Sequence, residues 1–509
     1  MLHGLEEFFN SFSKKNVDYI TFVTSLVVVI GIAFFILYNA ESTAILIEDY
    51  KNSVISVFGP IFLILTPLSF MFVLYLAFSK YGKYKLGGKE VNTEFSTISW
   101  MGMLFCGGIG GGIIYWSGVE WGYYLDEPLF GIIPYSKESY ALSSAYGLFH
   151  WGISAWALYA IPAVALSVSF YKYNLNTLRL SSSLRGLGLR NVENSLLGRL
   201  VDFLFVVATI GAAGGTIGSY LPMLSTGFSD IFNLDGTFLV DLSVLGLCVG
   251  LFGFSVYKGL TNGIKRLSDI NMLLAGIFLI IVLFLGPTFE IINSAFNGLV
   301  FMFTHFWEMS TLGITEQSDF ADTWTVFYWA WWVAFGPLVA LFVARISKGR
   351  TIREFILGGL LAPTLATFIW LSVFGGTALY LESVQSEPIS AAVSANLSTS
   401  LFKTLAYLPL SQITTALSTL VIITFFVTSS DSGSLVIDIL TAGGDQNPPK
   451  NQRIFWAVTE GVIASVLLLA GGLSTLQTAA IASGFPLALI MIGMCFALFK
   501  GLNKDVNNS

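Results

Sequence analysis

Long apolar runs alternate with short polar segments along almost the whole chain. Runs of about 20 residues are long enough to cross a bilayer as a helix. The pattern predicts twelve transmembrane helices, at residues 18–38, 55–79, 96–125, 142–171, 197–222, 239–257, 270–288, 322–345, 355–382, 411–442, 453–471 and 473–499. The stretch 289–316 is aromatic and polar by turns, which is typical of an amphipathic interfacial helix. The predicted fold class is therefore an all-α integral membrane protein.

Composition points the same way, because 11% of the residues are charged and 55% are apolar. Soluble domains carry about 25% charged residues, so a soluble globular enzyme is excluded. The net charge of −6 leaves no basic surface for nucleic acid. Cys106, Cys248 and Cys495 lie in apolar runs without metal-ligand spacing, so neither a disulfide framework nor a zinc site is predicted.

Basic residues divide very unevenly between the two sides that this helix count defines. If the N-terminus is cytoplasmic, 22 of the 25 lysines and arginines lie inside, and only Lys51, Lys137 and Lys403 lie outside. Such an excess follows the positive-inside rule. We therefore expect a multi-pass plasma-membrane protein with short cytoplasmic ends at residues 1–17 and 500–509. The first apolar run lacks a small-residue cleavage site and is expected to be retained as a span.

Two of the predicted spans are unusual in parallel ways. The third contains a glycine-rich stretch from Cys106 to Gly112, and the eighth contains Gly336-Pro337, which we expect to break the helix. Interrupted helices at corresponding positions indicate inverted repeats with a binding site near the midplane. We predict five-helix repeats at residues 96–288 and 322–499, an interfacial segment at 289–321, and two additional helices at 18–95.

Aromatic residues form two clusters in these repeats. One fills the eighth span around Trp331 and Trp332, and the other is Trp151, Trp156 and Tyr159 in the fourth span. A belt at the membrane interface explains most membrane tryptophans, and is the alternative for either cluster alone. Two clusters on facing helices can instead close a cage around a quaternary ammonium group, which rings bind through their faces.

Small and hydroxylated residues supply the candidate polar ligands. The glycines of the third span either allow close helix packing or leave backbone groups open to a solute carboxylate. The hydroxyls of Thr428 and Ser429 in the tenth span suit Na⁺, although they can equally bond their own helix backbone. Asp431 is an intramembrane acid and therefore a functional candidate, but a helix-interaction role is favoured for it, and the same applies to Glu120 and Glu460.

These motifs together resemble the betaine/carnitine/choline transporter family over nearly the whole chain. The residues that carry the resemblance are Phe327 to Trp332, Ala344 to Ile356, the glycine-rich third span and His150 to Tyr159. The resemblance implies twelve helices, a leucine-transporter-type core of two inverted five-helix repeats (helices 3–7 and 8–12), and often a homotrimer in the lipid membrane. Long tails that sense osmotic stress occur in the family, and the short ends here predict no such switch.

The resemblance also implies positions for substrate and ion. The substrate box maps to Trp151, Trp156, Tyr159 and Trp332, with Trp331 and Phe335 along the path below it and Gly108, Gly110 and Gly112 facing the solute. One sodium site maps to Cys106, Ile109, Phe425, Thr428 and Ser429. A second site would use a threonine pair, and here Thr209 is kept while Ala213 replaces its partner.

We therefore expect a secondary transporter, not an enzyme, that imports a zwitterionic trimethylammonium solute such as glycine betaine with Na⁺ as the coupling ion and no cofactor. A zwitterion is favoured because residues 105–119 and 324–344 contain no acid, whereas choline would favour one near the cage. The alternatives are choline uptake and a sodium-independent carnitine or betaine exchanger. An ion channel would need an open polar pore, and an intramembrane enzyme would need a catalytic constellation that three histidines cannot supply.

Overall fold

The computed structural model describes residues 18–38, 40–108, 112–235, 238–258, 265–315, 318–384, 389–390, 397–469 and 473–506, and within them the chain is helical with one isolated bridge between Lys85 and Thr351. The α-helices are α2 (Tyr19–Tyr38), α3 (Ala40–Phe78), α4 (Thr97–Gly108), α5 (Gly112–Ser117), α6 (Glu120–Asp126), α7 (Lys137–Trp151), α8 (Ile153–Lys172), α9 (Leu196–Phe232), α10 (Phe238–Lys258), α11 (Lys265–Leu285), α12 (Thr288–Thr304), α13 (Phe306–Thr311), α14 (Val326–Ile346), α15 (Ile352–Val384), α17 (Ser400–Ala406), α18 (Ser411–Thr441), α19 (Lys450–Leu469) and α20 (Leu473–Val506). Short helical turns are η1 (Lys80–Lys83), η2 (Leu180–Leu187), η3 (Val192–Asn194), η6 (Leu397–Thr399) and the π-helical η5 (Ala321–Thr325).

Every predicted span falls on a helix or a group of helices, with shifted ends. The second span is longer than predicted, because α3 begins at Ala40 rather than near residue 55. The third span is divided into α4, α5 and α6, and the fourth into α7 and α8. Among the described residues, seven helices are long and apolar enough to cross a membrane, or eight if the bent pair Thr97–Gly108 and Gly112–Asp126 counts as one. Twelve crossings therefore remain a prediction.

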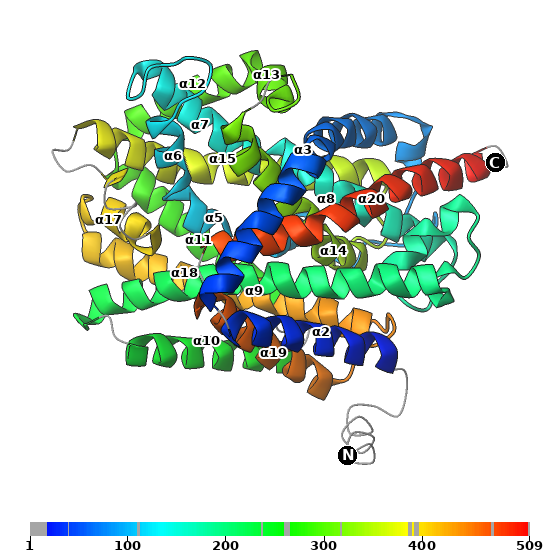
Figure 1. Ribbon diagram of the computed structural model, residues 1–509. Helices are drawn as coiled ribbons and strands as arrows, with labels where there is room; N and C mark the ends of the chain where they lie inside the picture. Colours follow the sequence, from blue (N-terminus) through cyan, green and yellow to red (C-terminus); the bar gives the residue numbers. More distant parts are fainter. Residues whose placement is uncertain are drawn as a thin grey trace.

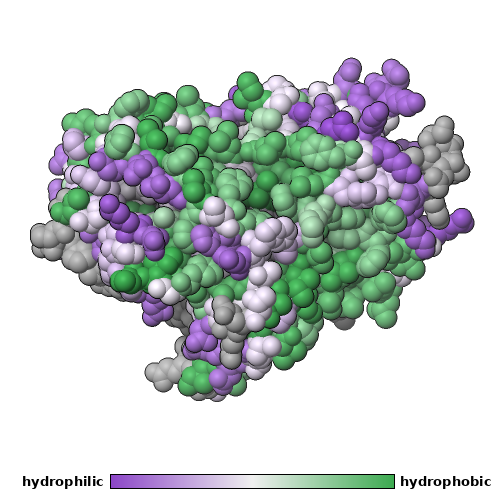
Figure 2. Space-filling view, turned by 90° about the horizontal axis from the view of Figure 1, so that it is seen from above, coloured by the Kyte–Doolittle hydropathy of each residue, from purple (hydrophilic) through white to green (hydrophobic). Residues whose placement is uncertain are grey.

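The helices form one bundle around α14. In Figure 1, α2, α9, α10 and α19 run side by side, while α3 and α20 cross the bundle at an angle. Helix α14 packs against α8, α9 and α20, and nearly all of its residues are buried. Hydrophobic side chains cover the middle of the face in Figure 2, and hydrophilic ones gather mostly toward its two ends. An apolar band between polar ends is what a membrane-embedded bundle requires.

The predicted break at Gly336-Pro337 is wrong, because α14 runs continuously from Val326 to Ile346. A proline inside a helix removes one backbone donor, and neighbouring helices in a membrane protein can compensate for that loss. Gly336 lies against α8, where an added Cβ would sit 3.6 Å from Cγ of Pro162. An added Cβ there would make an ordinary contact with α8, and the glycine does not end the helix.

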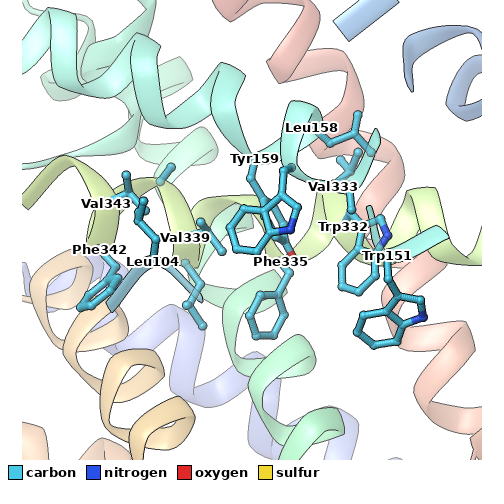
Figure 3. Packing of buried hydrophobic residues seen from close by; sticks show 14 of the residues in the cluster. Leu104, Trp151, Leu158, Tyr159, Trp332, Val333, Phe335, Val339, Phe342 and Val343 are labelled. Carbon is cyan, nitrogen blue, oxygen red and sulfur yellow. The ribbon is translucent and has the colours of Figure 1, made fainter. Parts of the chain in front are cut away.

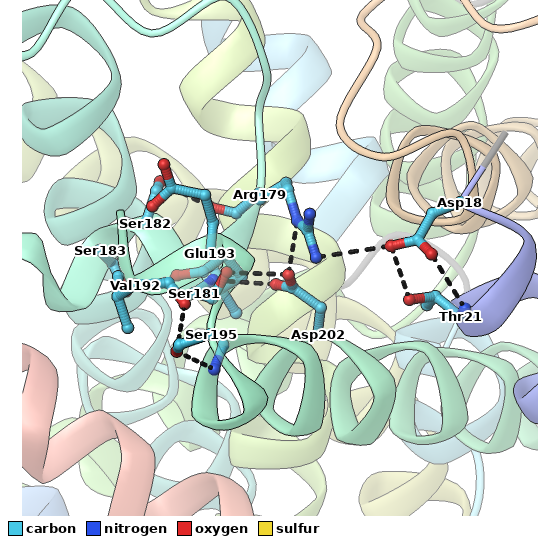
Figure 4. Close-up of polar contacts among 12 residues, drawn as sticks. Asp18, Thr21, Arg179, Ser181, Ser182, Ser183, Val192, Glu193, Ser195 and Asp202 are labelled. Carbon is cyan, nitrogen blue, oxygen red and sulfur yellow. Dashed lines mark hydrogen bonds and ion pairs between the residues drawn. The ribbon is translucent and has the colours of Figure 1, made fainter. Parts of the chain in front are cut away.

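A buried ionic cluster joins α2 and α9 to the segment after α8 (Figure 4). Nε of Arg179 lies 2.7 Å from Oδ2 of Asp202, and its Nη2 lies 3.6 Å from Oδ2 of Asp18. The backbone N–H of Ser181 donates to Oδ1 of Asp202 at 2.9 Å, and its hydroxyl donates to Oδ2 at 2.8 Å. Because its donors come from a neighbouring segment, Asp202 fixes the start of α9 relative to η2.

Candidate functional site

The predicted cage residues come together where α8 and α14 pack most closely. Ring centroids of Trp151 and Trp332 are 4.9 Å apart at 71°, and those of Tyr159 and Trp332 are 5.9 Å apart at 80°. Trp156 meets Tyr159 edge-on at 5.5 Å, while Trp331 stacks on Trp332 at 4.9 Å. Figure 3 shows Trp151, Trp332, Tyr159 and Phe335 grouped in this way. Ring faces attract a cation that has no hydrogen-bond donors, so this cluster has the chemistry of a quaternary-ammonium site.

A kink between α7 and α8 places the first of these rings. Helix α7 ends at Trp151, and Gly152 has φ −90° and ψ −140°, which is not helical. The carbonyl oxygen of His150 accepts the indole N–H of Trp332 at 2.9 Å. The fourth predicted span is therefore two helices, and their junction is tied to α14 by this hydrogen bond.

One indole of the cage has an unused donor. Nε1 of Trp156 is buried and has no hydrogen-bond partner among the described residues, whereas the hydroxyl of Tyr159 donates to the carbonyl of Gly108 at 3.2 Å. A buried N–H without an acceptor costs free energy, and a ligand oxygen can remove that cost. Trp156 is thus equipped to meet a solute carboxylate.

Glycines allow the third span to approach these rings. A Cβ added to Gly108 would lie 2.6 Å from Cη2 of Trp156, and one added to Gly112 would lie 3.2 Å from Trp151 and 3.3 Å from Trp331. The helix axes before residue 109 and after residue 111 differ by 70°. Gly110 and Ile109, predicted for solute and ion, lie outside the described residues. Gly108 and Gly112 therefore act here through close approach to the rings.

An acid lies directly behind the cage. Oε2 of Glu120, on α6, accepts the indole N–H of Trp151 at 2.6 Å and the hydroxyl of Tyr328 at 2.7 Å. Its Oε1 accepts the hydroxyl of Tyr124 at 2.5 Å. The prediction that no acid stands near the cage is therefore wrong. Glu120 follows the glycine-rich stretch in sequence, and only the turn after α5 brings it to Trp151.

Two of the residues predicted for the ion site, Cys106 and Thr428, contact a residue that sequence reasoning missed. Nδ2 of Asn271, on α11, lies 3.8 Å from Sγ of Cys106 and 3.3 Å from Oγ1 of Thr428, while the hydroxyl of Thr424 donates to Oδ1 of Asn271 at 2.8 Å. Asn271 is fully buried. A buried asparagine among apolar runs was the available signal, because such a group needs partners on neighbouring helices.

The hydroxyl of Thr428 forms hydrogen bonds with the backbone of its own helix, which was the alternative to a role as an ion ligand. It lies 2.9 Å from the carbonyl of Thr424 and 3.0 Å from that of Phe425. Ser429 is half-buried on the same helix. No group of three histidine, cysteine or acidic side chains that could hold a metal occurs in the described part of the chain. An ion here would depend on neutral oxygens, which Na⁺ accepts.

The remaining candidates are the second sodium position at Thr209 and Ala213 and the buried acids Asp431 and Glu460. The hydroxyl of Thr209 is buried and has no partner among the residues described, and the side chain of Ala213 is not described. Asp431 accepts a hydrogen bond from Ser255 on α10, and Glu460 accepts one from Ser434 at 2.7 Å. Both acids thus link neighbouring helices, in line with the helix-interaction role favoured for Asp431.

Known transporters are similar to this chain over most of its length. The glycine betaine/proline/choline/ectoine transporter of Vibrio parahaemolyticus is 36% identical over 472 residues, which cover 91% of this chain and 83% of the relative. A glycine betaine transporter of Bacillus subtilis is 34% identical over 452 residues, covering 88% and 87%. A solved manganese transporter of Eremococcus coleocola aligns over 78% of this chain and 77% of its own with a TM-score of 0.45 and 12% identity, too distant for an argument. The profile of the betaine/carnitine/choline family of transporters matches residues 20–507, so this chain is a member of that family and a transporter rather than an enzyme.

Proposed function

We propose that this transporter imports a zwitterionic quaternary-ammonium compatible solute, with glycine betaine as the representative, by Na⁺ symport. The observation that carries the substrate class is the ring cluster around Trp332 with the unpartnered N–H of Trp156 beside it. Ring faces attract the trimethylammonium group, and the indole N–H donates to the carboxylate. The similar transporters named above carry glycine betaine in their names, which supports the same substrate.

Choline uptake is the second candidate, and one observation favours it. Glu120 places a carboxylate one indole ring away from the cage, and a plain cation benefits from a nearby negative charge. Uptake of radiolabelled glycine betaine and choline into proteoliposomes, with and without an inward sodium gradient, separates the two candidates. Accumulation of choline but not of glycine betaine would overturn the preferred substrate.

The sodium proposal depends on the neutral oxygens near Asn271. Thr428→Ala combined with Ser429→Ala removes two hydroxyls that can face an ion between α4 and α18, and apolar neighbours cannot replace them. We expect half-maximal uptake to require far more sodium, while solute exchange persists. The control is the double variant Ser418→Ala, Thr419→Ala. These two buried residues are neighbours of each other on α18, and both hydroxyls donate to the carbonyl of Thr415. Uptake by the unmutated protein that ignores sodium would contradict symport and favour the sodium-independent exchanger.

We also propose cytoplasmic termini and a homotrimer in the plasma membrane. With the native cysteines replaced, a membrane-impermeant thiol reagent should label Ile133→Cys from outside and Glu90→Cys only from inside. Both positions are exposed, so access is decided by the side of the membrane. The reverse pattern would overturn the orientation, and native mass spectrometry of the detergent-solubilised protein would test the trimer.

A further inference from the structure

The carboxylate of Glu120 is buried and accepts hydrogen bonds from side chains on three helices. Its side chain receives hydrogen bonds from Tyr124 on its own helix, Trp151 on α7 and Tyr328 on α14, and the residue is 2% exposed. Both of its oxygens are occupied as acceptors. An acid buried in a bundle core is costly, so such a set of partners calls for a functional explanation.

The three hydrogen bonds to Glu120 suit an ionised carboxylate. An indole N–H only donates, so Oε2 must accept from Trp151. The three bonds measure 2.5, 2.6 and 2.7 Å, the short range of hydrogen bonds to a charged acceptor. An ionised carboxylate satisfies all three donors at once, because it offers about four acceptor sites on two oxygens.

His150 completes this cluster without neutralising it. Its Nδ1 lies 2.9 Å from the hydroxyl oxygen of Tyr124 and 3.4 Å from Oε1 of Glu120, and its Nε2 lies 3.2 Å from the hydroxyl of Thr325. When Tyr124 donates its phenolic proton to an ionised Glu120, a neutral His150 can donate from Nδ1 to the Tyr124 oxygen and accept at Nε2 from Thr325. This arrangement satisfies every group in the cluster and leaves the negative charge on Glu120.

That charge acts on the cage through one indole. Trp151 donates its N–H to Glu120 on one side, and on the other its ring meets Trp332 at 4.9 Å and Trp331 at 5.8 Å. Donation to an anion polarises the indole and makes its ring face more negative. The low dielectric of the core also lets the carboxylate attract a cation across the ring directly. Both effects strengthen binding of a positive charge and leave a neutral group of the same shape unaffected.

We propose that Glu120 is a positioning residue that makes this site select a positive charge: its ionised carboxylate orients and polarises Trp151, so that the cage discriminates a quaternary nitrogen from a neutral group of equal size. The inference depends on the proposed substrate class and deepens it. Glu120 does not itself reach the solute, because Trp151 stands between them.

The test uses two ligands that differ only at the central atom. Glycine betaine and 3,3-dimethylbutanoate share the carboxylate and the three methyl groups, but carbon replaces the quaternary nitrogen in the second. The ratio of their dissociation constants measures charge recognition apart from shape. We expect the wild type to prefer glycine betaine strongly, and Glu120→Gln to reduce that preference about five- to tenfold, chiefly through weaker betaine binding.

Two further variants make the test specific. Trp151→Phe keeps an aromatic face but lacks the N–H, so it should also lower the preference, and adding Glu120→Gln to it should lower the preference by less than Glu120→Gln does in the wild type. Glu460→Gln is the control, because Glu460 is also buried and accepts a hydrogen bond from Ser434 but lies on α19, away from the cage. Its ratio should equal that of the wild type.

Each result has a distinct meaning. If the wild type binds neither ligand, or binds both equally, the proposed substrate class fails. If the wild type discriminates but Glu120→Gln weakens both ligands by the same factor, Glu120 is only structural and the inference is overturned while the substrate class stands. If Glu120→Gln does not fold, Trp151→Phe decides alone, and an unchanged ratio in that variant overturns the inference.

Discussion

The glycine-rich segment α4 to α6 and the aromatic helix α14 lie on either side of the cage, and they contribute in opposite ways. The first changes direction by 70° across residues 109–111, and it supplies close backbone approach and the acid Glu120. The second runs unbroken from Val326 to Ile346 despite Pro337, and it supplies ring faces. Five of the six residues from 107 to 112 are glycine, whereas the proline of α14 removes a single backbone donor. The cage rings Trp331 and Trp332 lie on the regular helix α14, and the other rings lie on α7 and α8.

The largest effect should come from adding a methyl group where the irregular segment touches a ring. Gly108→Ala would place a Cβ 2.6 Å from Cη2 of Trp156 and force the indole to move. Overpacking of this kind costs about 1–3 kcal/mol, which corresponds to roughly 10- to 100-fold weaker glycine betaine binding if the bound geometry bears the strain. Isothermal titration or scintillation proximity binding would measure it.

Gly102 on α4 is the control for that substitution. Its Cβ would meet only Cγ of Met272, at 3.4 Å, so Gly102→Ala should bind almost as the wild type does. Equal losses in both variants would mean that α4 tolerates no added methyl group anywhere, and that the approach of Gly108 to Trp156 has no special importance.

A smaller loss should follow from removing one ring of the regular helix. Trp332→Leu keeps an apolar side chain but deletes the face shared with Trp151 and Tyr159. We expect glycine betaine to bind at least about tenfold more weakly, or about 1.4 kcal/mol. Trp307→Leu, at a tryptophan that is 61% exposed on α13, should bind normally. Wild-type affinity in Trp332→Leu would remove this ring from the site.

The smallest effect should come from the proline of α14. Pro337→Ala restores a backbone donor in a helix that is already continuous, so we expect an unchanged glycine betaine Kd and a small rise in Tm, because one net hydrogen bond contributes about 1 kcal/mol. Thermal unfolding in detergent and the same binding assay would show it. A severe loss of binding in Pro337→Ala would restore a functional role for an interruption at this position and remove the contrast between the two helices.

Much of the architecture follows from sequence alone. The apolar runs locate every long helix, since a bilayer leaves a spanning chain no alternative to internal backbone hydrogen bonds. Trp156 and Tyr159 share α8, and Trp331 and Trp332 share α14, so the relation of the rings within each pair follows from local spacing. The predicted set of cage residues came from the family resemblance, and only the fold brings Trp151 on α7 to the other rings.

Only the tertiary structure decided which polar side chains contact the cage residues and the predicted ion ligands. Glu120 and Trp151 are 31 residues apart, and Asn271 and Thr428 are 157 apart, so no helical period relates either pair. Gly336-Pro337 lies inside a continuous α14, which the sequence of that segment alone did not predict. Periodicity fixes what each helix presents, while the polar contacts between helices depend on rotations and offsets that packing alone sets.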